Sequence, residues 1–118
     1  MKQDRIYLEH ILDSIKQIEI YCANFKEVDD FFDDRKTQDA VVRNIEIIGE
    51  ASAKLSKNLR DKHKEIQWRQ IIDTRNLLIH GYFGISYLTV WNIVKKHIPQ
   101  LRKQIKKIIS DIKKSENL

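Results

Sequence analysis

Residues that interrupt helices are scarce in this chain, which has only three glycines and one proline among 118 residues. No stretch alternates apolar and polar residues in the manner of strands, so the sequence does not favour a β fold. The single cysteine, Cys22, cannot form an internal disulfide. Because it falls in an apolar-periodic stretch, we expect a small buried side chain and assign it no chemical role.

Long apolar runs are also missing, because no stretch approaches the ~18 uninterrupted apolar residues of a membrane span. The first residues lead directly into amphipathic sequence, so we expect a cytoplasmic protein with no membrane partner. A chain of this length, 42% hydrophobic and 33% charged, fits one compact domain over residues 1–118.

Positive charge is concentrated toward the C-terminal end of the chain, whose net charge is +5. One acid, Asp111, stands among eight basic residues there: Lys95, Lys96, Arg102, Lys103, Lys106, Lys107, Lys113 and Lys114. Such a stripe attracts phosphates, and it is equally typical of a solvated helix face, so it does not decide a function.

A short acidic cluster shows the opposite bias, and either faces a basic partner or forms an ordinary polar connection: Glu27, Asp29, Asp30, Asp33 and Asp34.

Apolar residues recur at three- and four-residue steps along nearly the whole chain, which predicts amphipathic helices. The first is expected over residues 4–24, with one stripe facing the core: Leu8, Ile11, Leu12, Ile15, Ile18, Cys22 and Phe25. Phe31 and Phe32 are expected to anchor the connection over residues 25–36. Asp34 or Thr37 then caps a second helix over residues 37–59. Gly49 in that helix costs about 1 kcal/mol relative to alanine, which indicates a close approach by another helix.

Residues 60–67 are polar and are expected to form a loop. A third helix follows over residues 68–79, ends near Gly81, and presents these apolar residues: Trp68, Ile71, Ile72, Leu78 and Ile79. The last helical region begins after Ser86. Pro99 is expected to kink or break it around residues 97–99, because proline lacks a backbone donor and clashes with the preceding turn. The predicted fold is an all-α, antiparallel up-and-down bundle of four to five helices.

The end of the third predicted helix carries the residues best suited to chemistry. At about 100° per residue, Asn76 and His80 lie one turn apart on one side, whereas Arg75 and His80 are about 140° apart. A guanidinium and an imidazole suit metal-free RNA cleavage, in which His80 moves the proton of the attacking 2′-hydroxyl and Arg75 binds the phosphate. Asn76 would orient the imidazole or hold a phosphate oxygen, and Tyr82 would stack a base or cover the site. Movement of the helix end or a two-fold dimer would overcome the 140° separation.

On spacing alone, Arg75 and His80 also fit a structural role, in which they cap the last backbone carbonyls of this helix. The remaining histidines, His10, His63 and His97, are expected to be structural or solvated. The spacing of a zinc site and a glycine-rich phosphate loop are both missing, so we expect no metal and no cofactor.

The run from Arg75 to Gly84 resembles the Arg-x4-His-x-Tyr motif of the HepT-like toxins, a branch of the HEPN superfamily. Residues 37–51 resemble the second helix of that family, and Trp68 and residues 91–101 follow in the expected order. The resemblance covers nearly the whole chain. It implies a HEPN-like homodimer that cleaves RNA without metal in a cleft between protomers, with Arg75 and His80 as its catalytic residues. Asn76 is the third predicted catalytic residue, on the helical spacing given above.

The resemblance also implies a switch, as in a type VII HEPN/MNT toxin–antitoxin pair. The cognate partner is an MNT-type nucleotidyltransferase antitoxin, which transfers AMP from ATP to Tyr82 and joins the toxin in a larger hetero-oligomer. Bulk and negative charge beside Arg75 would then block RNA binding.

Two other functions fit the same residues less fully. One is a non-catalytic HEPN adaptor that presents its motif to a nucleotidyltransferase, which predicts a tight complex without toxicity. The other is a helical DNA-binding or scaffold protein that depends on the lysine stripe, although no helix-turn-helix pattern accompanies it.

Overall fold

A computed structural model describes residues 2–80 and 86–116. Within these residues every regular element is helical, which confirms the all-α fold class. The elements, in order, are α1 (Lys2–Tyr21), α2 (Val28–Phe32), α3 (Arg35–Lys54), α4 (Lys57–Lys62), α5 (Trp68–His80), α6 (Tyr87–Asn92), the π-helical turn η1 (Ile93–His97) and α7 (Ile98–Glu116).

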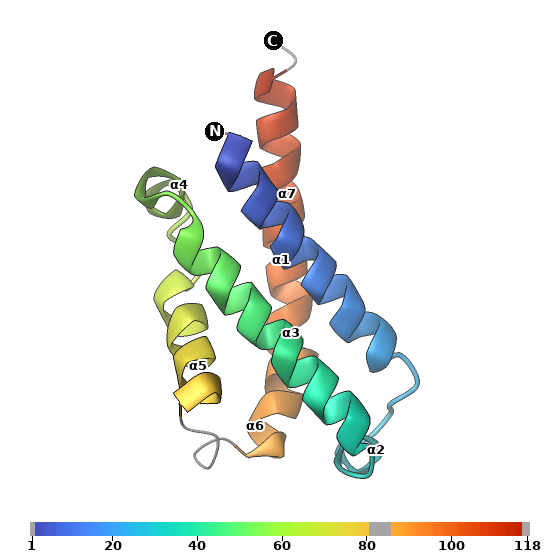
Figure 1. The fold of residues 1–118 in the computed structure, drawn as a ribbon. Helices are drawn as coiled ribbons and strands as arrows, with labels where there is room; N and C mark the ends of the chain where they lie inside the picture. The colour runs from blue at the N-terminus through green and yellow to red at the C-terminus, as the bar shows by residue number, and fades with distance from the viewer. Residues whose placement is uncertain (1, 81–85, 117–118) are drawn as a thin grey trace.

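Helix α3 is the centre of the bundle, with α1 packed along one side of it and α5 along the other (Figure 1). Helix α7 lies along α1, and successive long helices run in opposite directions, as predicted for an up-and-down bundle. Both termini lie at one end of the molecule, whereas the end of α5 and the start of α6 lie at the other. None of the helices in the described ranges combines the length and apolar character that a bilayer span requires.

The apolar stripe of α1 forms the middle of the core, as predicted. Four of its side chains have no exposed surface: Leu8, Ile11, Ile15 and Ile18. The equivalent stripe of α7 faces them, and its members are buried as well: Ile98, Leu101, Ile105, Ile108 and Ile109. Burying a side chain of this size contributes roughly 1.5–3 kcal/mol, so this face supplies much of the stability of the bundle.

Aromatic residues close the connection between α1 and α3. Phe31 is fully buried, with its ring centroid 6.2 Å from that of Phe25 and 5.6 Å from that of Trp91. Phe32 is 45% exposed, so the prediction that it also anchors this connection is wrong. The two residues are adjacent in the short helix α2, where neighbouring side chains point about 100° apart and only one reaches the core.

Asp34, and not Thr37, is the N-cap of α3. Its carboxylate accepts bonds from the backbone N–H of Thr37 at 3.0 Å and from the Thr37 hydroxyl at 2.8 Å. These bonds hold the pKa of Asp34 below its ordinary value, the backbone N–H having the larger effect. The cap fixes the start of the central helix.

The second predicted helix is too long, because α3 ends at Lys54 and a separate helix, α4, covers part of the expected loop. Ser56 starts α4 as its N-cap, with its hydroxyl accepting from the N–H of Leu59. Asp4 of α1 accepts bonds from Ser56 through its backbone N–H at 2.8 Å and its hydroxyl at 2.7 Å. This contact, 52 residues apart in sequence, stabilises the turn between the helices, which local periodicity does not reveal.

Pro99 does not break the last helical region, contrary to one of the two predicted outcomes. The chain is helical from Tyr87 to Glu116, and the irregularity is the π-helical turn that directly precedes α7. The N–H of Ile98 donates to the carbonyl of Ile93, five residues earlier. The wider turn accommodates the proline ring, which would clash with the carbonyl four residues before it in a regular α-helix.

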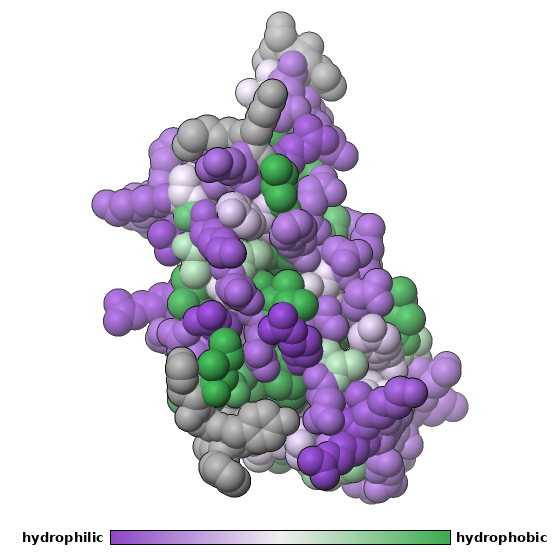
Figure 2. Space-filling view, viewed as in Figure 1, coloured by the Kyte–Doolittle hydropathy of each residue, from purple (hydrophilic) through white to green (hydrophobic). Residues whose placement is uncertain are grey.

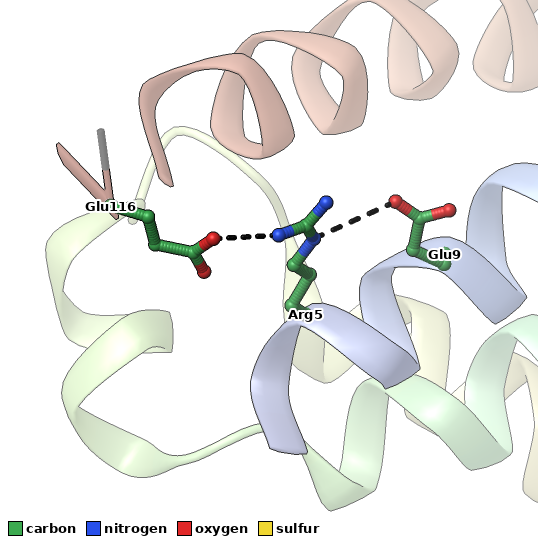
Figure 3. Close-up of polar contacts among 3 residues, drawn as sticks. All are labelled: Arg5, Glu9 and Glu116. Atoms are coloured by element: carbon green, nitrogen blue, oxygen red, sulfur yellow. Dashed lines mark hydrogen bonds and ion pairs between the residues drawn. The ribbon is translucent and has the colours of Figure 1, made fainter. Parts of the chain in front are cut away.

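An exposed ion pair joins the first and last helices near the chain termini (Figure 3). Nη1 of Arg5 lies 2.7 Å from a carboxylate oxygen of Glu116, and Nε of Arg5 lies 4.0 Å from Glu9. Such a pair contributes little energy, but it links α1 to the end of α7.

Candidate active site

Gly49 of α3 allows α5 to approach closely at the position of Arg75. A Cβ atom at position 49 would collide with Cβ of Arg75, would lie 2.9 Å from its Cγ, and would lie 3.2 Å from the Ile71 carbonyl oxygen. The glycine therefore has the packing role that its position in the sequence indicates. The structure adds that the residue it accommodates is the arginine of the candidate motif.

The guanidinium of Arg75 is held at the surface by its neighbour. Nη1 donates to the side-chain oxygen of Asn76 at 2.9 Å, and Asn76 is itself exposed. Nε of Arg75 is buried and has no hydrogen-bond partner among the described residues. No carboxylate in the described ranges forms an ion pair with this side chain, so its charge is available to an anion.

The geometry brings two of the four predicted site residues together. The side-chain oxygen of Asn76 accepts a bond from Arg75, which leaves the N–H donors of the amide for His80 or a phosphate oxygen, the two roles expected of it. His80 is the last residue of α5, one helical turn beyond Asn76. Its side chain, and the whole of Tyr82, lie outside what the structure describes, so their roles remain predictions.

Two apolar side chains near the end of α5 are exposed, Leu77 by 54% and Ile79 by 40%. Of the two neighbouring apolar residues that this helix was predicted to present, Leu78 is buried and Ile79 is exposed. The reason is that α5 packs mainly on α3 and has only sparse contacts with the helices that follow it. Figure 2 shows apolar side chains gathered over the lower part of α5 and the middle of α3, among hydrophilic neighbours.

The basic residues of α7 occupy its outward flank, an arc of about 140° from Arg102 to Lys107 at about 100° per residue. Gln100, Gln104 and Asp111 lie beside one edge of this arc. Arg102 pairs with Glu19 of α1 at 3.5 Å. The lysines of this flank are exposed: Lys103, Lys106, Lys107, Lys113 and Lys114.

Other reactive groups in the described residues are accounted for structurally. Burial raises the pKa of Cys22 to about 11, which keeps it a neutral thiol and agrees with the absence of a predicted role. The carbonyl of His63 accepts from Nε1 of Trp68 at 3.1 Å, and its ring lies 3.4 Å from Glu65. In the described ranges no three histidine, cysteine or carboxylate side chains gather in a way that could hold a metal ion.

Comparison with known proteins places the chain in a family. Residues 11–108 match the family model described as HepT-like, ribonuclease HepT-like. A Methanocaldococcus jannaschii protein, named a gamma-glutamylcyclotransferase with a provisional RNase assignment, is 45% identical over 99% of this chain. The chain spans about half of that relative, 53% of its length. No solved structure matches the chain.

Two shorter relatives match over most of their own length. A protein of Caldanaerobacter subterraneus subsp. tengcongensis, provisionally named an RNase, is 42% identical over 92% of this chain and 96% of its own. A protein of Thermococcus cleftensis, named a probable ribonuclease HepT, is 41% identical over 86% of this chain and 92% of its own. With a family model that covers most of the chain and relatives at these identities, the chain belongs to the HepT-like ribonuclease family.

Proposed function

We propose that this protein is a metal-independent endoribonuclease toxin, which cleaves RNA with Arg75 and His80 and is neutralised by AMPylation of Tyr82. The observation that carries the proposal is the position of Arg75, unpaired with any described carboxylate, on the helix that ends at His80. Membership of a ribonuclease family gives this pair its chemistry.

Cleavage begins when the ribose 2′-oxygen attacks the adjacent phosphorus. His80 accepts the 2′-hydroxyl proton as the new O–P bond forms. The bond from phosphorus to the 5′-oxygen of the next nucleotide then breaks, and that oxygen takes a proton from the imidazolium. The products are a 2′,3′-cyclic phosphate and a free 5′-hydroxyl, with no metal or external cofactor consumed.

Arg75 supports this reaction by electrostatics. Paired N–H donors of a guanidinium bind the non-bridging phosphate oxygens, on which negative charge increases in the transition state. The contact with Gly49 fixes the start of this side chain, and Asn76 engages one of its terminal nitrogens. A pre-positioned charge of this kind stabilises the transition state without reorganisation during the reaction.

A homodimer would complete the site. At about 100° per residue, positions 75 and 80 lie about 140° apart around a helix, so one helix does not easily direct both residues at one phosphate. Leu77 lies near His80 on the outward side of α5, and its 54% exposure favours a partner surface there. A second protomer seated on this side would supply its own Arg75 or His80 across a two-fold axis.

Regulation would act at Tyr82, two residues after His80. A cognate MNT-type nucleotidyltransferase would transfer AMP from ATP to the phenol oxygen, releasing pyrophosphate. The added phosphate carries negative charge to the neighbourhood of Arg75 and competes with RNA for it.

Cleavage by purified protein tests the catalytic proposal. We expect wild-type protein to cut RNA in the presence of a chelator and His80→Ala to lose about 100-fold or more of that rate. His10→Ala is the matched control, because His10 is an exposed histidine on α1. Equal rates for wild type and His80→Ala would refute the catalytic role, and a chelator-sensitive reaction would refute the metal-free mechanism.

Intact mass tests the regulatory proposal. Co-expression with the cognate nucleotidyltransferase should add one or more AMP units to the wild type and to Tyr87→Phe, but none to Tyr82→Phe. Modification that persists in Tyr82→Phe would place the target elsewhere. A tight complex without modification, toxicity or cleavage would instead support the adaptor function.

A further inference from the structure

A groove of about 370 Å³ runs between α5 and the α6–η1–α7 segment, on the side of α5 away from Asn76. Its apolar lining includes Ile45 and Ile48 of α3, and Ile98 and Leu101 of α7. The groove exists because α5 packs mainly on α3 and only sparsely on α6, η1 and α7. Its volume falls within the range of about 300–1,000 Å³ that is typical of small-ligand sites.

Neutral hydrogen-bonding side chains surround this apolar floor. Five side-chain amides line the groove, one from the residue before α5, one from α5, one from α6 and two from α7: Gln67, Gln70, Asn92, Gln100 and Gln104. Hydroxyls from Thr74 and Thr89 join them. Each amide offers both a donor and an acceptor, so the walls suit a flat ligand with polar edges.

Charge is sparse in the groove although the chain as a whole is basic. No lysine or arginine lines it, and the titratable lining residues are Glu65 and His97. The contrast is sharpest on α7, which exposes lysines on its outward flank and contributes Gln100 and Gln104, at the edge of that flank, to the groove. A phosphate would find no permanent cation here, so the lining favours an uncharged ligand.

Two features link the groove to the candidate active site. Thr74 lines it and is the immediate neighbour of Arg75, about 3.8 Å away between Cα atoms. The π-helical turn η1 contributes Ile93 and His97 to the lining, and such turns occur frequently at functional sites. A nucleotide chain held at Arg75 could therefore place a neighbouring base in the groove.

We propose that this groove is a base-binding subsite, which receives an unpaired base of the RNA next to the phosphate held by Arg75. The inference rests on the proposed ribonuclease function and adds a source of sequence preference to it. Amide side chains read base edges by paired donor and acceptor contacts, and the isoleucine floor accepts the face of the ring.

Side-chain amide signals in NMR spectra test this subsite without requiring cleavage. The probe is a short 2′-O-methyl RNA of mixed sequence, which lacks the attacking hydroxyl and stays intact. We expect it to shift the NH₂ signals of Gln70, Gln100 and Gln104, and the free nucleosides to shift the same signals at millimolar concentration. Inorganic phosphate should leave them unchanged. Unmoved signals with both the RNA and the nucleosides would overturn the proposal.

Cleavage patterns provide the second readout. In wild-type protein the preferred base at one position beside the cut should be favoured about tenfold, and Gln70→Leu/Gln104→Leu should abolish that preference while cleavage remains dependent on His80. Gln3→Leu, an exposed glutamine of α1, is the matched control. An unchanged pattern in the double variant refutes the subsite and leaves the ribonuclease function intact. Amide shifts in a protein that never cleaves RNA would refute the ribonuclease function and retain the base site.

Discussion

Helices α1 and α5 both pack on α3, but the two contacts are built differently. The α1 side chains that face the core, Leu8, Ile11 and Ile15, have no exposed surface. Across α3, only Trp68 and Leu78 of α5 are buried, other residues of the helix are half-buried or exposed, and Arg75 approaches Gly49 closely. The first contact removes apolar surface from water, whereas the second positions a charged side chain and leaves a groove beside it.

Because of this difference, the α1 side of α3 mainly stabilises the fold, whereas the α5 side carries the candidate site. Tight apolar contact on the α1 side accounts for much of the folding free energy, so residues there tolerate little change. The α5 side retains a guanidinium without a described ion-pair partner, exposed apolar residues and a groove, which contribute little to folding and are open to a ligand. Substitutions on the two sides should therefore affect different measurements.

The largest expected effect is on the free energy of unfolding, when a leucine is replaced by alanine in α1 and, for comparison, in α5. Leu8→Ala opens a cavity and should lower the free energy of unfolding by ~2–5 kcal/mol. Leu77→Ala, at a side chain 54% exposed, should change it by less than about 0.5 kcal/mol. Denaturant unfolding measures both. Equal losses would show that α5 is buried against this chain in solution.

Leu77→Ala should have its effect on self-association instead. The proposed dimer covers this side chain, so sedimentation should show a weaker dimer in the variant than in the wild type. A variant that dimerises as tightly as the wild type would exclude this face of α5 as the interface.

Gly49→Ala should lower both the folding stability and the rate of RNA cleavage. The new Cβ displaces Arg75, and we expect a loss of about 1–3 kcal/mol in stability together with a fall in RNA cleavage. Ala53→Gly, at an exposed position on the same helix, should cost about 1 kcal/mol through helix propensity but leave cleavage unchanged. Normal cleavage by a folded Gly49→Ala protein would show that the position of Arg75 does not depend on this contact.

A smaller, pH-dependent effect is expected at the cap of α3. Bonds from the backbone N–H and then the hydroxyl of Thr37 lower the pKa of Asp34, so the folded state favours the carboxylate. The resulting stabilisation is present above the ordinary pKa of about 3.9 and disappears as pH falls through the lowered value. Tm measured against pH should show a gap between wild type and Asp34→Ala at pH 7 that narrows in acid. A gap independent of pH would exclude the charge as its cause.

The smallest effect is expected for the ion pair between the chain ends. Arg5→Ala and Glu116→Gln should each cost less than about 1 kcal/mol, because both side chains are partly exposed and screened by salt. A double-mutant cycle measures the coupling between them. Coupling that persists in high salt would show a more protected contact than the partial exposure of the two side chains indicates.

Much of the fold could be predicted because periodicity is a local property. The three- and four-residue spacing of apolar residues identified the buried stripes of α1 and α7, and Gly49 indicated a close helix contact. The errors fall where distant groups decide the local structure. Asp4 stabilises the turn before α4 from 52 residues away, and Ile79 is exposed because α5 has few neighbours beyond α3.

The candidate site also contains features that the sequence predicted and features that it did not. Arg75, Asn76, His80 and Tyr82 could be selected from their chemistry and from the family motif, and the sequence also predicted that Arg75 and His80 diverge around the helix. The bond between Arg75 and Asn76 could not be predicted, because adjacent helical residues do not face each other and side-chain rotation brings them together. The amides of the groove come from three helices and from the residue before α5, and no spacing in the sequence reveals that they converge.

By itself, the sequence determined that this protein is helical, which faces of its helices are buried, and which short segment carries the chemistry. Helix formation and amphipathic burial depend on residues within a few turns, so they can be read along the chain. The tertiary structure alone decided that Gly49 lies beneath Arg75 and that a neutral groove adjoins a basic helix. These features arise where helices from distant parts of the chain meet, because packing in three dimensions determines which side chains become neighbours.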